Sequence, residues 1–334
     1  MNWHVLLILS ITVSFFSCER KDSTLELRKP KGGVALGGSL SLAFSLTEID
    51  INPIKMNNAA ATFIGNQVHG TLVKNSPGFE EPTPCIAERW ELDETGLIWL
   101  FHIRQGMTFQ LQECVEEPRE ITASDVVNSL TRICSSDAVG GLFKSFRTQI
   151  KGGQEFFNQE AATVSGLEAL DDYRLKITLN KPNQAFLYML TEPASGIVHV
   201  CDDGNIAASG PFIIAHSNGG LSLERNEHYA INDHFGNQLP YLDRIEFNQF
   251  ENTSAELEAF FAGEIDVVSN IYQDPIRNIM DKHIEDFASN KPKYVIQRSG
   301  ELASYDLYTL HISGLNGYQM DYLGRPDLSR ITLD

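Results

Sequence analysis

The sequence predicts an α/β protein built on mixed sheets, and three observations support this. Segments with the two-residue alternation of strands are interspersed with segments of helical periodicity, and no repeat period is visible. Apolar residues make up 42% and charged residues 21% of the chain, an ordinary globular composition that can bury a real core. With roughly 100–200 residues per domain, the 334 residues predict about two domains, or one large domain with an inserted subdomain.

The individual elements follow from local patterns. Apolar and polar side chains alternate, as in half-buried strands, at residues 39–46, 173–179, 221–225 and 244–250. Residues 90–104 have the pattern of a hairpin, and residues 265–268 that of a buried strand. Helical patterns occupy residues 59–73, 122–132 and 255–261. In the second helix Thr122 is the candidate N-cap, and Asp125 lies in the first turn, where the helix dipole favours negative charge.

The first eighteen residues predict an export signal. Residues 5–16 form an apolar run of 12, shorter than the ~20 residues that a membrane-spanning helix needs. The Ser17-Cys18 pair that follows resembles a bacterial lipoprotein cleavage box, which implies that Cys18 becomes the lipidated first residue of the mature chain. Residues 19–36 are then a tether between membrane and folded body. The alternative is a plain secretory signal with an incidental cysteine.

Charge and cysteine content narrow the classes of partner. With 26 Lys and Arg against 44 Asp and Glu, the formal charge is −18, which argues against a nucleic-acid partner. If Cys18 carries lipid, an even number of cysteines is left for an oxidising compartment. These four cysteines allow three full pairings, among which the sequence does not choose: Cys85, Cys114, Cys134 and Cys201.

The motifs of common enzyme classes are absent. The sequence contains neither of the glycine-rich nucleotide-binding patterns, no H-E-x-x-H and no G-x-S-x-G. The neighbouring acid pairs lie in turn-rich segments and are expected to be solvated surface. We therefore expect no cofactor, no metal and no enzymatic activity. A secreted hydrolase that uses scattered acids or Ser39 is the less favoured alternative, because no motif places a base beside a nucleophile.

Residues 121–132 read I-T-A-S-D-V-V-N-S-L-T-R. Ten further segments stand beside it as candidate motifs, at residues 37–40, 50–53, 84–91, 99–109, 166–173, 179–182, 209–212, 223–229, 239–245 and 262–266. In this order the segments resemble the family 5 solute-binding proteins of ABC importers, the group of the oligopeptide- and dipeptide-binding proteins. The closest match is residues 121–132, which are similar to the family's Thr-Ala-x-Asp-Val-x-x-Ser helix.

The resemblance implies a periplasmic-binding-protein type II clamshell of α/β class with mixed sheets. The lipoprotein signal peptide is then residues 1–18 and the tether 19–36, lobe I combines 37–66 with 196–297, the inserted subdomain is 67–195, and 298–334 form the hinge and the start of lobe II. Family chains are usually longer, so we expect a C-terminally truncated chain whose second lobe is largely missing and whose own peptide affinity is weak or absent.

The resemblance also implies the function and, by position only, the site. A peptide is bound in the cleft between the lobes and delivered to an ABC permease with its ATPase subunits, by a monomer held by its N-terminal lipid on the periplasmic face of a bacterial membrane. The residues expected to face the ligand are Asn57, Asn58, Ala59, Ala60, Leu142 and Phe143. Alternatives are a truncated remnant that does not transport, or a surface lipoprotein that uses the same scaffold.

Overall fold

The computed structural model describes residues 31–44, 49–75, 81–138, 141–217, 220–302, 305–319 and 326–333. The predicted signal segment, Cys18 and most of the predicted tether lie outside these residues. The end of that tether contacts the folded body, because the backbone of Lys31 exchanges two hydrogen bonds with the Asn237 side chain, at 3.1 and 2.8 Å. Within the described part of the chain, no helix combines the length and the apolar character that crossing a membrane requires.

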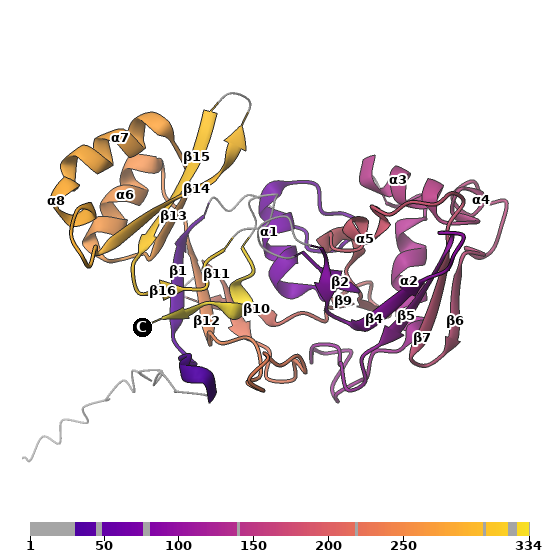
Figure 1. The fold of residues 1–334 in the computed structure, drawn as a ribbon. Coiled ribbons are helices and arrows are strands. Elements are labelled where there is room, and N and C mark those ends of the chain that lie inside the picture. Colours follow the sequence, from indigo (N-terminus) through magenta and orange to yellow (C-terminus); the bar gives the residue numbers. More distant parts are fainter. Residues whose placement is uncertain are drawn as a thin grey trace, which may run out of the picture.

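A seven-stranded mixed sheet forms the first structural unit (Figure 1). Its central strand β1 is parallel to β12 and β13, whereas the other neighbouring pairs are antiparallel. The predicted class of fold, α/β with mixed sheets, is therefore confirmed. In spatial order the strands are β10 (Phe212–Ser217), β11 (Gly220–Arg225), β12 (Arg244–Asn248), β1 (Ser39–Ala43), β13 (Val267–Tyr272), β15 (Tyr305–Ile312) and β14 (Tyr294–Leu302).

Alternation along β1 explains how this sheet buries a core. Leu40 and Leu42 are buried, and their register partners on β12 are Ile245 and Phe247, which are buried too. On the other part of the sheet, Phe260 belongs to a second apolar cluster formed with the helices that cover β13, β14 and β15. These helices are α6 (Thr253–Ala262), α7 (Gln273–Lys282) and α8 (Ile284–Phe287) (Figure 1).

The second unit is a subdomain around an antiparallel sheet of four strands, in the order β4 (Ala87–Leu92), β5 (Ile98–Ile103), β7 (Arg174–Thr178) and β6 (Leu167–Asp171). Helix α2 (Ala123–Ile133) packs against β6 and β7. Its N-cap is Thr122, as predicted, and the Asp125 carboxylate accepts the Thr122 backbone N–H at 2.9 Å. The remaining helices are α3 (Gly141–Gln149), α4 (Gly153–Phe157) and α5 (Phe186–Met189).

A junction of short elements joins the two units. Helix α1 (Ala59–Val68) ends five residues before the end of the predicted helix at 73, because His69 adopts an extended backbone. The chain then passes close to a turn of another segment, where a Cβ at Gly210 would lie 2.4 Å from the Val68 carbonyl carbon. The other short elements are the strand pairs β2 (Val73–Lys74) with β3 (Thr83–Pro84), β8 (His199–Val200) with β9 (Ile206–Ala207), and β16 (Leu315–Asn316) with β17 (Thr332–Leu333), and the 3₁₀ turns Lys31–Gly33, Pro193–Ser195 and Leu328–Arg330.

The structure contains a disulfide between Cys114 and Cys201, which belongs to one of the three pairings that the sequence allowed. Cys85 and Cys134 are buried free thiols. Burial raises the pKa of the Cys134 thiol to about 12, so it remains protonated and unreactive at neutral pH. The disulfide therefore fixes the loop between β5 and α2 to the β8–β9 hairpin.

Candidate ligand-binding cavity

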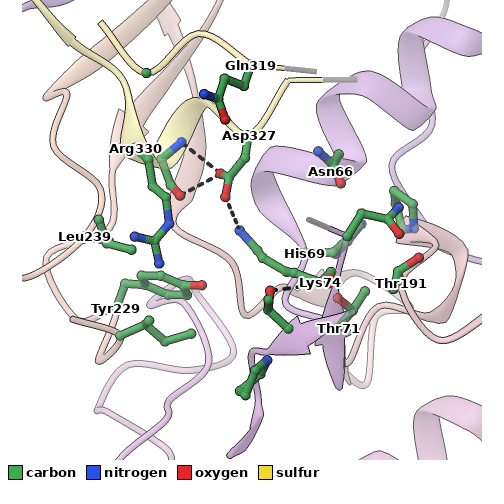
Figure 2. Close-up of a pocket in the computed structure, with 17 residues that line it drawn as sticks. Asn66, His69, Thr71, Lys74, Thr191, Tyr229, Leu239, Gln319, Asp327 and Arg330 are labelled. Carbon is green, nitrogen blue, oxygen red and sulfur yellow. Dashed lines mark hydrogen bonds and ion pairs between the residues drawn. The ribbon is translucent and has the colours of Figure 1, made fainter. Parts of the chain in front are cut away.

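A polar cavity of about 440 Å³ lies where α1, the β2–β3 hairpin and the C-terminal segment meet (Figure 2). Its polar lining comes from segments far apart in the sequence, including Asn66 and His69 at the end of α1, Lys74 on β2, and Asp327 and Arg330 in the C-terminal segment. Tyr229 and Leu239, from the loop between β11 and β12, close another side. The volume falls within the roughly 300–1,000 Å³ that small-molecule pockets occupy.

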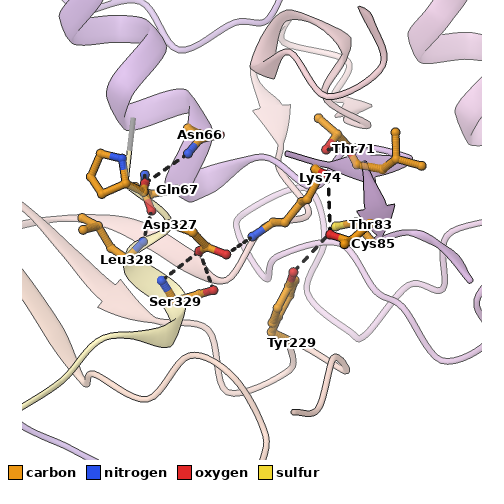
Figure 3. A network of polar contacts seen from close by, with 12 residues as sticks. Asn66, Gln67, Thr71, Lys74, Thr83, Cys85, Tyr229, Asp327, Leu328 and Ser329 are labelled. Atoms are coloured by element: carbon orange, nitrogen blue, oxygen red, sulfur yellow. Dashed lines mark hydrogen bonds and ion pairs between the residues drawn. The ribbon is translucent and has the colours of Figure 1, made fainter. Parts of the chain in front are cut away.

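Asp327 is the centre of a polar network on the cavity wall (Figure 3). One carboxylate oxygen accepts the backbone N–H and the hydroxyl of Ser329, at 3.0 and 2.6 Å. The other lies 3.4 Å from the Lys74 ammonium. Burial by itself raises the pKa of Asp327, but Lys74 and the Ser329 hydrogen bonds outweigh burial and hold it below its ordinary value. The carboxylate is therefore ionised at neutral pH.

The C-terminal segment is attached to α1 by side-chain amides. Gln67 donates to the Pro326 carbonyl at 3.1 Å and accepts the Leu328 N–H at 3.2 Å, and Asn66 also donates to Pro326 (Figure 3). Gln67 is fully buried, so both of these bonds are shielded from water. Two of the cavity's walls are thus fixed to each other.

His69 supplies a neutral polar group to the wall. Its Nε2 lies 2.7 Å from the Ile51 carbonyl oxygen, which makes Nε2 the protonated nitrogen and Nδ1 an acceptor. Among the described residues, Nδ1 has no hydrogen-bond partner. Burial lowers the pKa of His69 to about 4, and this effect outweighs the hydrogen bond to Ile51, which raises it. The imidazole is therefore uncharged at neutral pH.

The cavity wall carries a net positive formal charge. Lys74 and Arg330 are cations on either side of the Asp327 carboxylate (Figure 2). Tyr229 is fully buried, and burial raises the pKa of its phenol well above 10, so this group is neutral. With His69 also neutral, two cations face one carboxylate. The arrangement suits a small polar ligand with one negative charge.

The residues predicted to face a ligand lie outside this cavity lining. Asn58 is the N-cap of α1 and accepts the Ala61 N–H at 2.7 Å, with Asn57 exposed beside it and Ala59 and Ala60 in the first turn. Leu142, on α3, is half-buried. Phe143 is only 3% exposed and packs into the apolar core of the subdomain. The ligand contacts of these residues, and the lipidation of Cys18, remain predictions.

Sequence reasoning missed the residues that line the cavity. Asn66, His69 and Lys74 belong to no chemical motif, and they lie more than 250 positions from Asp327 and Arg330. The available signal was the pair of opposite charges at Asp327 and Arg330, three positions apart and each followed by an apolar residue, Leu328 and Ile331. Ser39, considered above as a nucleophile, lies in β1, and its hydroxyl has no hydrogen-bond partner among the described residues.

Comparison with known proteins gives a consistent result. Residues 81–305 match the family model described as bacterial extracellular solute-binding proteins, family 5 Middle. The oligopeptide-binding protein AmiA of Streptococcus pneumoniae is 25% identical over 254 residues, 71% of this chain and 37% of AmiA. Heme-binding protein A of Haemophilus influenzae is 30% identical over 126 residues, 37% of this chain and 22% of that protein.

Solved structures share the fold. The ABC transporter-associated periplasmic binding protein DppA from Helicobacter pylori, in complex with the peptide STSA, superposes with a TM-score of 0.61 at 22% identity. The alignment covers 79% of this chain and 51% of DppA. The likeness shows a periplasmic-binding-protein type II fold, as predicted. The chain spans about half the length of that solved protein. Its match to AmiA covers 37% of the length of AmiA.

Proposed function

Because the chain belongs to the family 5 bacterial extracellular solute-binding proteins, we propose that it binds peptides and delivers them to an ABC permease. The observation that carries the proposal is the match to the family model across residues 81–305, which includes all four strands of the subdomain sheet and most of the seven-stranded sheet. AmiA is named for binding oligopeptides, and the DppA structure holds a peptide. These relatives favour a peptide over other solutes.

The proposed mechanism uses the backbone of an extended peptide. Its amides and carbonyls pair with exposed strand edges, so that affinity does not depend on reading each side chain. Closure of the lobes then excludes water and strengthens those hydrogen bonds. Asn57 and the first turn of α1 are exposed or half-exposed and remain candidate contacts, as does Leu142. Phe143 is already packed in a core and is the weakest of the predicted contacts.

The cellular setting belongs to the same proposal. A diacylglyceryl group on Cys18 would hold the protein on the periplasmic face of a bacterial membrane as a monomer, beside the permease and ATPase subunits. No enzymatic activity is part of the proposal. Labelling of cells with a lipid precursor tests the anchor: the wild-type chain is expected to incorporate label, and Cys18→Ser is expected to abolish incorporation. Label that persists in Cys18→Ser would overturn the assignment of this cysteine.

Peptide binding is tested on the chain from residue 19 onward by equilibrium dialysis against a mixed peptide library, followed by mass spectrometry. Because the second lobe is expected to be largely missing, peptides are expected to be enriched only weakly with the protein. Asn57→Ala is expected to weaken that binding several-fold, whereas Asn158→Ala, at an exposed asparagine on the subdomain, is the matched control. Enrichment of hemin without any peptide would overturn the proposal, and no enrichment of either would favour the truncated remnant that does not transport.

A further inference from the structure

The polar cavity at the junction has the properties of a second binding site, separate from the residues proposed to contact a peptide. Most of its lining residues are polar or charged, and Pro84, Ile231 and Leu239 add apolar surface. The polar groups of a small-molecule site fix the orientation of its ligand, and its apolar groups add affinity. Hydrogen bonds of the Gln67 side-chain amide fix α1 to the C-terminal segment and so fix two walls of the cavity to each other.

The charged groups of the wall differ in how many hydrogen-bond donors or acceptors they have left for a ligand. Both oxygens of Asp327 already accept hydrogen bonds or an ion pair, from Ser329 and from Lys74. Lys74 has further N–H donors beyond the one directed at Asp327. The Arg330 guanidinium has no hydrogen bond or ion pair among the described residues, and its residue is exposed. In a chain with a net charge of −18, this is a local cationic position with unused donors.

We propose that this cavity binds a small monocarboxylate, with the ligand's carboxylate paired with the Arg330 guanidinium while the Lys74 ammonium stays paired with Asp327. A guanidinium presents a planar fork that matches a carboxylate in two parallel hydrogen bonds. A monoanion neutralises the net positive charge of the lining. A phosphate dianion would exceed that charge and would be repelled more strongly by Asp327, which lies 3.4 Å from Lys74. The site does not depend on the proposed function and would exist whatever solute the cleft between the lobes binds.

The rest of the wall favours a ligand that also carries an N–H donor. The hydroxyls of Thr71 and Thr191 donate to carbonyl oxygens, of Val73 and Tyr188, which leaves their lone pairs as acceptors. The neutral His69 ring also lines the cavity, but its unpaired Nδ1 is buried and faces away from solvent. An acid with an amine or amide group satisfies both ends of the cavity. At about 440 Å³ the cavity has room for an amino acid or a dipeptide.

Two sources share this chemistry, a free amino acid and the carboxyl end of a short peptide. Titration calorimetry of the chain from residue 19 onward against free amino acids, Ala-Ala, Ala-Ala amide and inorganic phosphate distinguishes them. Saturable binding of an amino acid or of Ala-Ala supports the site and identifies its source. Equal binding of Ala-Ala and its amide, stronger binding of phosphate, or no binding of any carboxylate overturns it.

Matched arginine variants locate the binding. Arg330→Gln is expected to weaken carboxylate binding at least tenfold, because it removes the unpaired cation. Arg244→Gln removes a cation from an exposed ion pair with Glu224 on the seven-stranded sheet, and is expected to leave carboxylate binding unchanged. Because Arg330 is exposed, its variant is expected to fold, which circular dichroism verifies. Unchanged affinity in a folded Arg330→Gln variant would refute the site, while peptide binding at the cleft would be unaffected by that result.

Discussion

The subdomain and the junction are held together by different means. Around Phe101, the subdomain buries one continuous apolar cluster that includes Phe109, Phe146 and Phe186. At the junction, apolar side chains such as Val73 and Leu328 belong to the clusters of the neighbouring units, and individual polar groups, among them Gln67, Lys74 and Asp327, add further connections between the segments. Apolar packing tolerates the exchange of one side chain for another of similar volume, whereas a buried polar contact is lost when either partner is removed.

This difference bears on where a binding site forms. A close-packed core leaves no space larger than a water molecule. Polar contacts at their fixed hydrogen-bond lengths keep segments apart, and the cavity lies where three such segments meet. Removing one connection at a time therefore has different consequences in the two regions.

The largest expected effect concerns the disulfide Cys114–Cys201, which joins positions 87 residues apart. In the chain-entropy model, a cross-link over such a loop stabilises the folded state by about 4–5 kcal/mol. We expect Cys114→Ser with Cys201→Ser to lower the free energy of unfolding by about this amount in urea titrations monitored by tryptophan fluorescence, because the subdomain contains Trp90 and Trp99.

The control for this prediction is the reductant. Dithiothreitol is expected to destabilise the wild-type chain to the level of the double variant and to leave the double variant unchanged, since Cys85 and Cys134 are already free. A double variant as stable as the oxidised wild type would show that the apolar cluster alone holds this loop.

An intermediate effect is expected from His69 at the junction. Its pKa is about 4 in the folded chain, because of burial, against an ordinary value of 6.5. Between pH 6.5 and 4 the unfolded chain therefore takes up a proton that the folded chain does not, and the free energy of unfolding falls as the pH falls. The difference in pKa corresponds to a loss of about 3 kcal/mol, complete below pH 4.

His69→Gln separates this residue from the carboxylates. Glutamine keeps an N–H donor for the Ile51 carbonyl and does not titrate. We expect the stability advantage of the wild type over His69→Gln to shrink by about 3 kcal/mol between pH 7 and pH 4. The measurement is chemical unfolding at several pH values. A difference that stays constant over this interval would contradict the assignment of a neutral, buried His69.

The sequence predicted the subdomain better than the junction. The hairpin at 90–104 and the Thr122 N-cap with Asp125 depend on neighbours within a few residues, and the structure confirms them. The end of α1 was predicted at 73 and lies at Val68, because the position is set by a contact with the distant Gly210. The cavity was not predicted, since no local pattern brings Lys74 beside Asp327.

Folding also selected a cysteine pair that sequence alone could not. The sequence allowed three full pairings of the four cysteines. In the structure the loop between β5 and α2 lies beside the β8–β9 hairpin, and the Cα atoms of Cys114 and Cys201 are 5.9 Å apart. Cys85 and Cys134 were instead enclosed in the apolar cluster. In both cases the missing information was the long-range arrangement of segments that are individually well predicted.

The smallest expected effect compares one ion pair from each region. Lys74 and Asp327, with side chains 20% and 32% exposed, form the junction pair, whereas Arg174 and Asp171, 52% and 45% exposed, form a pair on the subdomain sheet. Exposed pairs contribute about 0.2–1 kcal/mol because water screens them, and partial burial strengthens the attraction.

Double-mutant cycles with Lys74→Met and Asp327→Asn, and with Arg174→Met and Asp171→Asn, measure each coupling through urea unfolding. We expect a coupling of about 1–2 kcal/mol at the junction and below about 0.5 kcal/mol on the subdomain sheet. Equal coupling energies would mean that water screens the junction pair as strongly as the pair on the sheet surface. The Lys74–Asp327 pair would then add little to the stability of the junction.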